Sequence, residues 1–260
     1  MEIKSYTPGT PSWIDLGTTD VDAAATFYGE LFDWEIADLG PDAGGYRMCT
    51  LNGKFVAGLG PAQRDDVPPY WNTYIAVDDA DAIAAKIVDA GGQAYMEPMD
   101  VMEAGRMAVF ADPTGAQISI WQAKDHSGSQ LANEPGAFCW NELATRDVAT
   151  AKAFYTTVFG WEINDVDMGS MTYTIFNLPT KPGDDKTVAG LFEMTDDIPK
   201  DVPSNWGVYF NVANTDEAVA KATELGAELV MGPIDIMPGR FAMLKDPQGA
   251  RFHVLQFPYS

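Results

Sequence analysis

The chain is 260 residues long, 46% of them hydrophobic, and its 38 acidic and 16 basic residues give a formal net charge of −22. The length suffices for two ordinary domains, and the hydrophobic content is too high for a disordered chain. A surface this acidic repels nucleic-acid phosphates and anionic membranes, so neither is expected as a partner. No apolar run approaches the ~20 residues of a membrane helix. No signal peptide is visible and the two cysteines lack partners, so we expect a cytoplasmic protein.

The first strand and helix are marked by a cap and by apolar spacing. Residues 14–18 are expected to form a strand, and Asp20 is a suitable helix N-cap because its carboxylate can accept a free amide of the first turn. Apolar residues then recur at helical spacing through residues 21–32. Two further strands are predicted around the hairpin turn Asn52-Gly53, at 46–51 and 54–60.

The same order of elements restarts after a loop rich in proline and aspartate at residues 61–69. A strand is predicted at 72–77, and a helix at 80–88 is closed by Gly91-Gly92. Three more strands are predicted at 94–96, 106–111 and 117–122. The first half therefore contains two modules of the βαβββ kind.

The second half of the chain repeats the first. Residues 140–147, WNELATRD, correspond to residues 13–20, WIDLGTTD. Residues 246–250, DPQGA, correspond to residues 112–116, DPTGA. The offset drifts only from 140 − 13 = 127 to 246 − 112 = 134. One unit has therefore been duplicated, with a few residues inserted in loops.

These motifs resemble a known superfamily. A strand followed by a helix with Phe27-Tyr28 and the segment LFDW at 31–34 is similar to the opening module of the vicinal oxygen chelate superfamily, which has the glyoxalase, bleomycin-resistance and extradiol dioxygenase fold. The layout is closest to tandem actinobacterial glyoxalase-like proteins that are often labelled hydroxylases. The resemblance implies an α+β fold of four βαβββ modules, in two tandem glyoxalase-like halves whose curved mixed sheets enclose clefts. The expected boundaries are a first domain at 1–124, a linker at 125–135 and a second domain at 136–260.

The resemblance also implies where a metal would be held. In metal-dependent members the ligands stand on the first and last strands of the modules. Those positions here carry Trp13, Trp140, Asn72, Gly207, Ser119 and His253. Indole, glycine and a lone serine do not bind divalent metals, and His253 with Glu142 gives two ligands where a catalytic site normally keeps three. We therefore expect no metal and no other cofactor, and neither glyoxalase I nor extradiol dioxygenase activity.

Strand alternation selects the residues that face each cleft. In the first half these candidate binding residues are Trp13, Asp15, Asn72, Tyr74, Ser119 and Trp121. In the second half they are Trp140, Glu142, Tyr209, Arg251 and His253. Aromatic walls with a few polar groups are typical of sites for small organic molecules.

Several of these residues have two interpretations. Trp13 and Trp140 either contact a ligand or fill emptied metal sites. Glu142 is either a functional acid or a carboxylate paired with Arg251. His253 is either a core histidine or the partner of Glu142 in an acid–base pair.

Three functions are compatible with this sequence. The first is a metal-free enzyme of this fold that binds a small metabolite and uses Glu142 and His253 for lyase, isomerase or hydroxylase-type chemistry. The second is a non-catalytic protein that binds or sequesters a small molecule such as a drug, and the third is a structural module with filled clefts. The protein is expected to be a monomer or a homodimer. The sequence leaves open whether modules pair within a half or across halves, and hence whether His253 faces Glu142 or Asp15.

Overall fold

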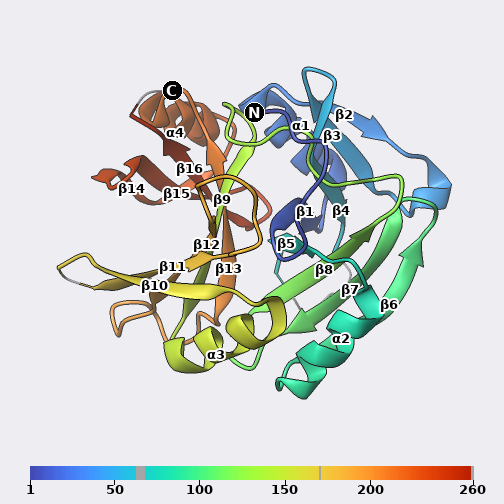
Figure 1. Cartoon of the computed structure of the whole chain (residues 1–260). Coiled ribbons are helices and arrows are strands. Elements are labelled where there is room, and N and C mark those ends of the chain that lie inside the picture. Colours follow the sequence, from blue (N-terminus) through green and yellow to red (C-terminus); the bar gives the residue numbers. More distant parts are fainter. Residues whose placement is uncertain (63–67, 170, 259–260) are drawn as a thin grey trace.

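The computed structural model describes residues 1–62, 68–169 and 171–258, and these form two eight-stranded sheets with four α-helices (Figure 1). The first half contains β1 (Pro11–Thr18), α1 (Val21–Phe32), β2 (Glu35–Asp38), a 3-10 turn (Pro41–Ala43), β3 (Arg47–Leu51), β4 (Lys54–Pro61), β5 (Tyr70–Ala76), α2 (Ala80–Asp89), β6 (Gln93–Val101), β7 (Gly105–Ala111) and β8 (Gln117–Ala123). The second half contains β9 (Phe138–Thr145), α3 (Val148–Phe159), β10 (Glu162–Asp167), β11 (Thr172–Asn177), β12 (Thr187–Glu193), β13 (Asn205–Asn211), α4 (Thr215–Glu224), β14 (Glu228–Ile236), β15 (Gly239–Lys245) and β16 (Arg251–Gln256). The expected α+β fold of four βαβββ modules is confirmed.

The sheet order answers the question of module pairing. The first sheet runs β2-β3-β4-β1-β5-β8-β7-β6, and the second runs β10-β11-β12-β9-β13-β16-β15-β14. In each sheet the first strands of the two modules pair antiparallel, β1 with β5 and β9 with β13. Modules therefore pair within a half, so His253 lies in the same sheet as Glu142.

The two helices of the first half begin where the sequence analysis predicts them, at Val21 and Ala80. Asp20, Asp79 and Asp147 each accept a hydrogen bond from a backbone amide of the first turn, and Asn214 does the same for α4. The sequence did not mark the edge strands β2 and β10, and it predicted only residues 94–96 of the nine-residue β6. These strands lie at sheet edges and contain no buried residue, so they lack the buried apolar face that identifies a strand.

The helices and the convex faces of the sheets form two core clusters, and each cluster contains residues of both halves. Helix α1 contacts α4, and α2 contacts α3. Tyr28 of α1 donates its hydroxyl to Asp246 of the second half at 2.9 Å. Tyr155 of α3 donates to Asp112 of the first half at 2.8 Å. The DPxG turn of each half therefore binds the helix of the other half.

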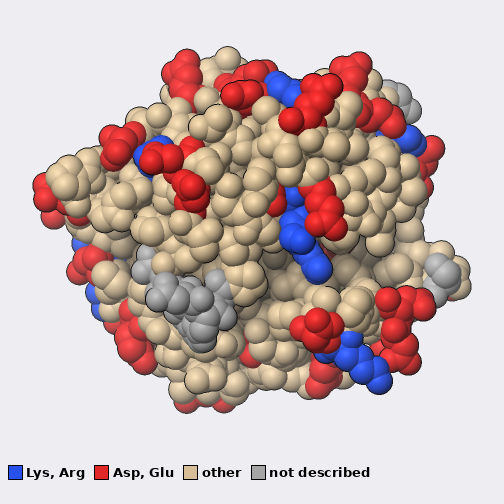
Figure 2. All heavy atoms as spheres, turned by 180° about the vertical axis from the view of Figure 1, so that it is seen from behind, with Lys and Arg blue, Asp and Glu red and all other residues tan. Residues whose placement is uncertain are grey.

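The opposite faces of the two sheets carry separate aromatic clusters, and in Figure 1 the two sheets curve away from each other. Figure 2 shows acidic side chains spread over the rear surface, with few basic ones among them. No helix in the described part of the chain is long and apolar enough to cross a membrane.

Candidate functional site

In the second half, the concave face of the sheet carries a carboxyl held between two phenols. Tyr173 donates its hydroxyl to Glu142 Oε2 at 2.6 Å, and Tyr209 donates to Glu142 Oε1 at 2.6 Å. The indole Nε1 of Trp140 donates to the Tyr173 hydroxyl oxygen at 3.0 Å. We call these four residues the second-half cluster.

The first half contains the same arrangement at the same repeat positions. Asp15 Oδ2 accepts hydrogen bonds from Tyr74 at 2.9 Å and from Tyr46 at 3.2 Å. Trp13 Nε1 donates to the Tyr46 hydroxyl oxygen at 3.1 Å. We call these residues the first-half cluster. The same polar network of four side chains is present in both copies. This indicates that each cluster is a specific feature of the fold.

A strand glycine makes room for the tyrosine in each cluster. Gly58 pairs with Asp15 across β1 and β4, and Gly190 pairs with Glu142 across β9 and β12. A Cβ at Gly58 would lie 1.8 Å from the hydroxyl oxygen of Tyr46, and one at Gly190 would lie 1.9 Å from that of Tyr173. The phenols therefore occupy the volume that a side chain would fill at these strand positions.

Sequence analysis did not select Tyr46 and Tyr173 as site residues. Both lie outside the strand segment that carries the obvious repeat. A signal was nevertheless present, because 46 + 127 = 173 is the offset that also relates Trp13 to Trp140. Tyrosine at both positions, with glycine at both Gly58 and Gly190, identifies the network once the register is known.

Burial changes the acidity of these groups. Burial raises the pKa of Asp15 to about 6, although hydrogen bonds from Tyr74 and Tyr46 act in the opposite direction. Burial likewise raises the pKa of Glu142, against hydrogen bonds from Tyr173 and Tyr209. Burial raises the pKa of each of these phenols too, so they remain proton donors near neutrality.

The two halves differ beside the carboxyl. In the first half, Asn72 Nδ2 donates to Ser119 Oγ at 2.9 Å. In the second half these positions are Gly207 and His253, and a Cβ at Gly207 would lie 2.7 Å from His253 Cε1. The His253 ring thus fills the space above Gly207.

His253 is part of a stack of aromatic rings on the same face of the sheet as Glu142. Its ring stacks on Tyr209 with centroids 4.2 Å apart and planes 12° apart. Its Nδ1 lies 3.2 Å from the Val208 carbonyl oxygen, which assigns the proton of the neutral ring to Nδ1. Burial lowers the pKa of His253 to about 4. Both oxygens of Glu142 are taken by phenols, so the structure shows no direct hydrogen bond between Glu142 and His253.

Trp121 and Arg251 are the remaining predicted residues. Trp121 is buried, and its Nε1 donates to the backbone oxygen of His126 at 2.8 Å. Arg251 is exposed at the start of β16. Among the described residues, no ion pair joins Arg251 to Glu142.

The residues at the superfamily's ligand positions do not fit a divalent metal. By the resemblance these positions are Trp13, Asn72 and Ser119 in the first half, and Trp140, Gly207 and His253 in the second, and a further position falls in residues 56–59 and 188–192, which have no ligand side chain. Only His253 offers a good metal donor, and its Nδ1 is directed to a backbone carbonyl. Over residues 1–62, 68–169 and 171–258, no group of three or more His, Cys, Asp or Glu could hold a metal ion.

Comparisons with known proteins agree with this fold. Residues 10–120 match the Glyoxalase/Bleomycin resistance protein/Dioxygenase superfamily, and residues 138–179 match the Bleomycin resistance protein-like N-terminal family. The "Putative glyoxylase CFP32" of Mycobacterium tuberculosis is 44% identical over 97% of both chains. The chain belongs to this superfamily. A further superfamily relative, the "Anthracycline biosynthesis protein DnrV" of Streptomyces peucetius, is 36% identical over 96% of this chain and 94% of its own.

Solved structures of the superfamily share the fold at low identity. The Mn(II)-bound glyoxalase from Novosphingobium aromaticivorans matches with a TM-score of 0.65 and 19% identity, over 96% of this chain and 82% of its own. The 2,2',3-trihydroxybiphenyl 1,2-dioxygenase from Sphingomonas wittichii strain RW1 matches with a TM-score of 0.65 and 14% identity, over 96% and 91%. At such identities the likeness concerns the fold alone.

Proposed function

We propose that the cleft of the second half binds a small, largely aromatic molecule that carries a carbonyl or phenolic oxygen, and that it does so without a metal ion. The observation that carries this proposal is the carboxyl of Glu142, held 2.6 Å from each of two phenol hydroxyls on an aromatic cleft wall. Apolar walls with a few convergent polar groups are the usual construction of a small-molecule site.

The cluster has the chemistry for handling a ligand oxygen. A phenol that releases Glu142 can donate its hydrogen bond to a carbonyl or phenolate instead. Burial raises the pKa of Glu142, so its carboxyl can then hold a proton that is exchanged with the ligand oxygen. Groups that titrate closer to neutrality are suited to general acid–base transfer. In this proposal Glu142 moves the proton, Tyr173 and Tyr209 bind the oxygen, and neutral His253 stacks against the ring.

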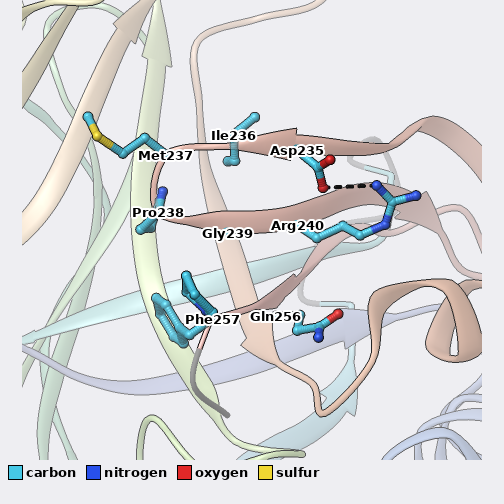
Figure 3. A pocket seen from close by; sticks show the side chains of 9 residues that line it. Asp235, Ile236, Met237, Pro238, Gly239, Arg240, Gln256 and Phe257 are labelled. Carbon is cyan, nitrogen blue, oxygen red and sulfur yellow. Dashed lines mark hydrogen bonds and ion pairs between the residues drawn. The ribbon is translucent and has the colours of Figure 1, made fainter.

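Exposure favours the second half over the first. The side chain of Trp13 is 3% exposed, whereas Trp140 at the same repeat position is only partly buried. At the β14–β15 hairpin of the second half, a shallow pocket of about 530 Å³ is lined by Ile236, Met237 and Phe257 (Figure 3). Its volume falls in the range of ordinary ligand sites. Phe257 packs against the same apolar cluster as Trp140, so the pocket adjoins this cluster.

The names of relatives support an aromatic ligand. Two of them are named as anthracycline biosynthesis proteins. Anthracyclines are planar, polycyclic molecules whose phenol and ketone oxygens match the donors and the acid of the second-half cluster.

Binding without turnover is the second candidate function. It is favoured by the match of residues 138–179 to the bleomycin resistance protein-like family, since this segment includes Trp140, Glu142 and Tyr173. A ligand that binds and is recovered unchanged would favour this candidate over catalysis.

The test is a titration with 1,8-dihydroxyanthraquinone, a planar phenolic ketone, followed by tryptophan fluorescence and calorimetry. We expect one molecule bound per chain, with an affinity that EDTA does not change. Glu142→Gln and Tyr209→Phe should each weaken binding by about tenfold, as expected for one lost hydrogen bond to a charged or polar ligand group.

Asp15→Asn is the matched control, because Asp15 holds the same repeat position in the first half. It should leave the affinity unchanged. Equal losses in Asp15→Asn and Glu142→Gln, or no binding by the wild-type protein, would contradict the proposal.

A further inference from the structure

A group of four charged side chains lies beside the β6–β7 hairpin of the first half. Arg106 on β7 donates to both carboxylate oxygens of Asp81, at 2.9 and 2.8 Å, and its Nη1 lies 3.5 Å from Asp100 on β6. Lys124, which follows β8, donates to Asp100 Oδ1 at 3.1 Å. Two carboxylates thus meet two cations, so the charges within this group balance.

The second half repeats this group but lacks one cation. Arg240 on β15 donates to both carboxylate oxygens of Asp216, at 2.7 and 2.9 Å, and to Asp235 Oδ1 at 2.9 Å. Among the described residues, no second cation forms an ion pair with either carboxylate. The side chain of Asp235 is 83% exposed, whereas that of Asp100 is 55% exposed. One negative charge is therefore left without a partner at the β14–β15 hairpin.

The strand register shows which residue is missing. The residue that pairs across the strands with the arginine is Gln122 in the first sheet and Gln256 in the second. Two positions further along the chain stand Lys124 and Pro258. Proline has no amino group on its side chain, so the second half lacks the ammonium that completes the group in the first half.

Lys124 contacts the first hairpin through its backbone and its side chain. Its amide nitrogen donates to the Ala104 carbonyl oxygen at 3.0 Å, and its Nζ donates to Asp100 at 3.1 Å. The aliphatic part of the side chain joins these two contacts. This place in the repeat therefore accommodates an ammonium group that is attached to an apolar body.

The shallow pocket of about 530 Å³ lies at the matching place in the second half. Its lining includes both Asp235 and Pro258, the two residues that correspond to the first-half ion pair. Apolar side chains, among them Met237 and Phe257, line the same pocket (Figure 3). An unpaired carboxylate thus borders an apolar surface that a small molecule can cover.

We propose that this pocket is a separate binding site for a small organic ammonium ion. The charged nitrogen lies against Asp235, as Lys124 Nζ lies against Asp100, and the apolar part of the ligand lies on Met237 and Phe257. The net charge of −22 raises the concentration of such cations near the protein surface. The site lies outside the second-half cluster, so this inference does not rest on the proposed function.

The experiment compares two ligands of the same shape on the full chain at pH 7 and low salt. 1-Naphthylmethylamine carries an ammonium group, and 1-naphthalenemethanol carries a neutral hydroxyl instead. The amine should bind about fivefold more tightly than the alcohol, which is the upper range for an exposed ion pair. Sodium chloride at about 1 M should remove this difference. Both ligands should shift the methyl NMR signal of Met237, assigned with Met237→Leu.

Three exposed variants test the position of the charge. Asp235→Asn should reduce the affinity for the amine to that for the alcohol. Pro258→Lys should have the same effect, because it restores the lysine of the first half and so supplies the missing partner of Asp235. Asp100→Asn is the matched control in the first half, and it should leave the affinity for the amine unchanged.

Equal affinities of the wild type for the amine and the alcohol would overturn the site. Equal losses in Asp100→Asn and Asp235→Asn would also overturn it, because they would show attraction to the acidic surface in general. Selective binding of the amine without any binding of 1,8-dihydroxyanthraquinone would refute the proposed function and leave this site standing.

Discussion

On folding, the carboxyls of Asp15 and Glu142 lose contact with water, and each accepts hydrogen bonds from two phenols instead. A phenol compensates a buried carboxylate less well than water does, so burial remains the dominant effect on both acids. The consequence is a pair of acids that hold their protons at higher pH than an exposed carboxyl. Such groups make the folded state sensitive to pH.

Asp15 allows a prediction with a definite sign. Its pKa rises from a usual 3.8 to about 6 on folding, so its contribution to stability is complete below pH 3.8 and is lost as the pH rises through about 6. Asp15→Asn keeps a neutral side chain at every pH. Relative to the wild type, the variant should therefore gain about 1 kcal/mol in free energy of unfolding between pH 5 and pH 8, measured by urea denaturation at both values.

Ser119→Ala serves as the control for this experiment, since it alters the same cleft wall without removing an acid. Its stability relative to the wild type should not change between the two pH values. A parallel pH profile for Asp15→Asn and the wild type would mean that Asp15 is ionised in the folded protein at pH 5.

At the scale of secondary structure, the strands β4 and β12 are adapted to the clusters by one glycine each. Both glycines lie in ordinary extended strand, so their role is steric and does not depend on an unusual backbone angle. A strand glycine normally weakens a sheet because it packs nothing. Here the hydroxyl end of a tyrosine packs in the vacated space.

Gly190→Ala should therefore destabilise the protein by about 1–3 kcal/mol, the usual cost of overpacking a filled site. The new methyl group would meet the Tyr173 hydroxyl and push it away from Glu142. Urea denaturation gives the stability, and the variant should also lose affinity for 1,8-dihydroxyanthraquinone.

Gly17→Ala is the matched control, because Gly17 is also a strand glycine but a Cβ there would have its nearest neighbour at 3.8 Å. It should change stability by less than about 1 kcal/mol. Combining Gly190→Ala with Tyr173→Ala should cost less than the sum of the two single changes. Additive costs would show that the methyl group and the phenol do not collide.

At the scale of the whole molecule, a symmetric pair of hydrogen bonds is among the contacts that tie the halves together. Each runs from a helix tyrosine of one half to the aspartate of the DPxG turn in the other, and each tyrosine also accepts a bond from a buried tryptophan, Trp71 or Trp206. Both tyrosines are fully buried. The halves share two core clusters, each built from residues of both halves, so we expect them to unfold in one transition.

Tyr28→Phe should lower the free energy of unfolding by about 2 kcal/mol, because it removes a hydrogen bond to a charged group and leaves Trp71 without its acceptor. Tyr155→Phe should cost a similar amount by the symmetry of the repeat. Denaturation curves for Tyr28→Phe, Asp246→Asn and the double variant measure the coupling between these two side chains. A coupling near zero, or a second transition in the wild-type curve, would argue against this cross-half tie.

The sequence by itself determined the features that depend on neighbours along the chain. The repeat, the helices at 21–32 and 80–88 with the cap at Asp20, and the placement of Trp13 and Asp15 on one strand face follow from local patterns, and the resemblance then implied the fold. The sequence alone also shows that the ligand positions lack metal donors, since this depends only on which residues occupy them.

Tertiary structure decided what depends on residues far apart in the chain. Tyr46 reaches Asp15 across 31 positions, Trp161 reaches the Gly9 carbonyl across 152, and Tyr28 reaches Asp246 across 218. His126 was interpreted as a linker residue, because nothing in its sequence neighbourhood indicates that the chain folds back onto Trp13. The physical reason is that close packing and hydrogen-bond partners are set by three-dimensional proximity, whereas residue patterns report only the face of an element on which a side chain lies.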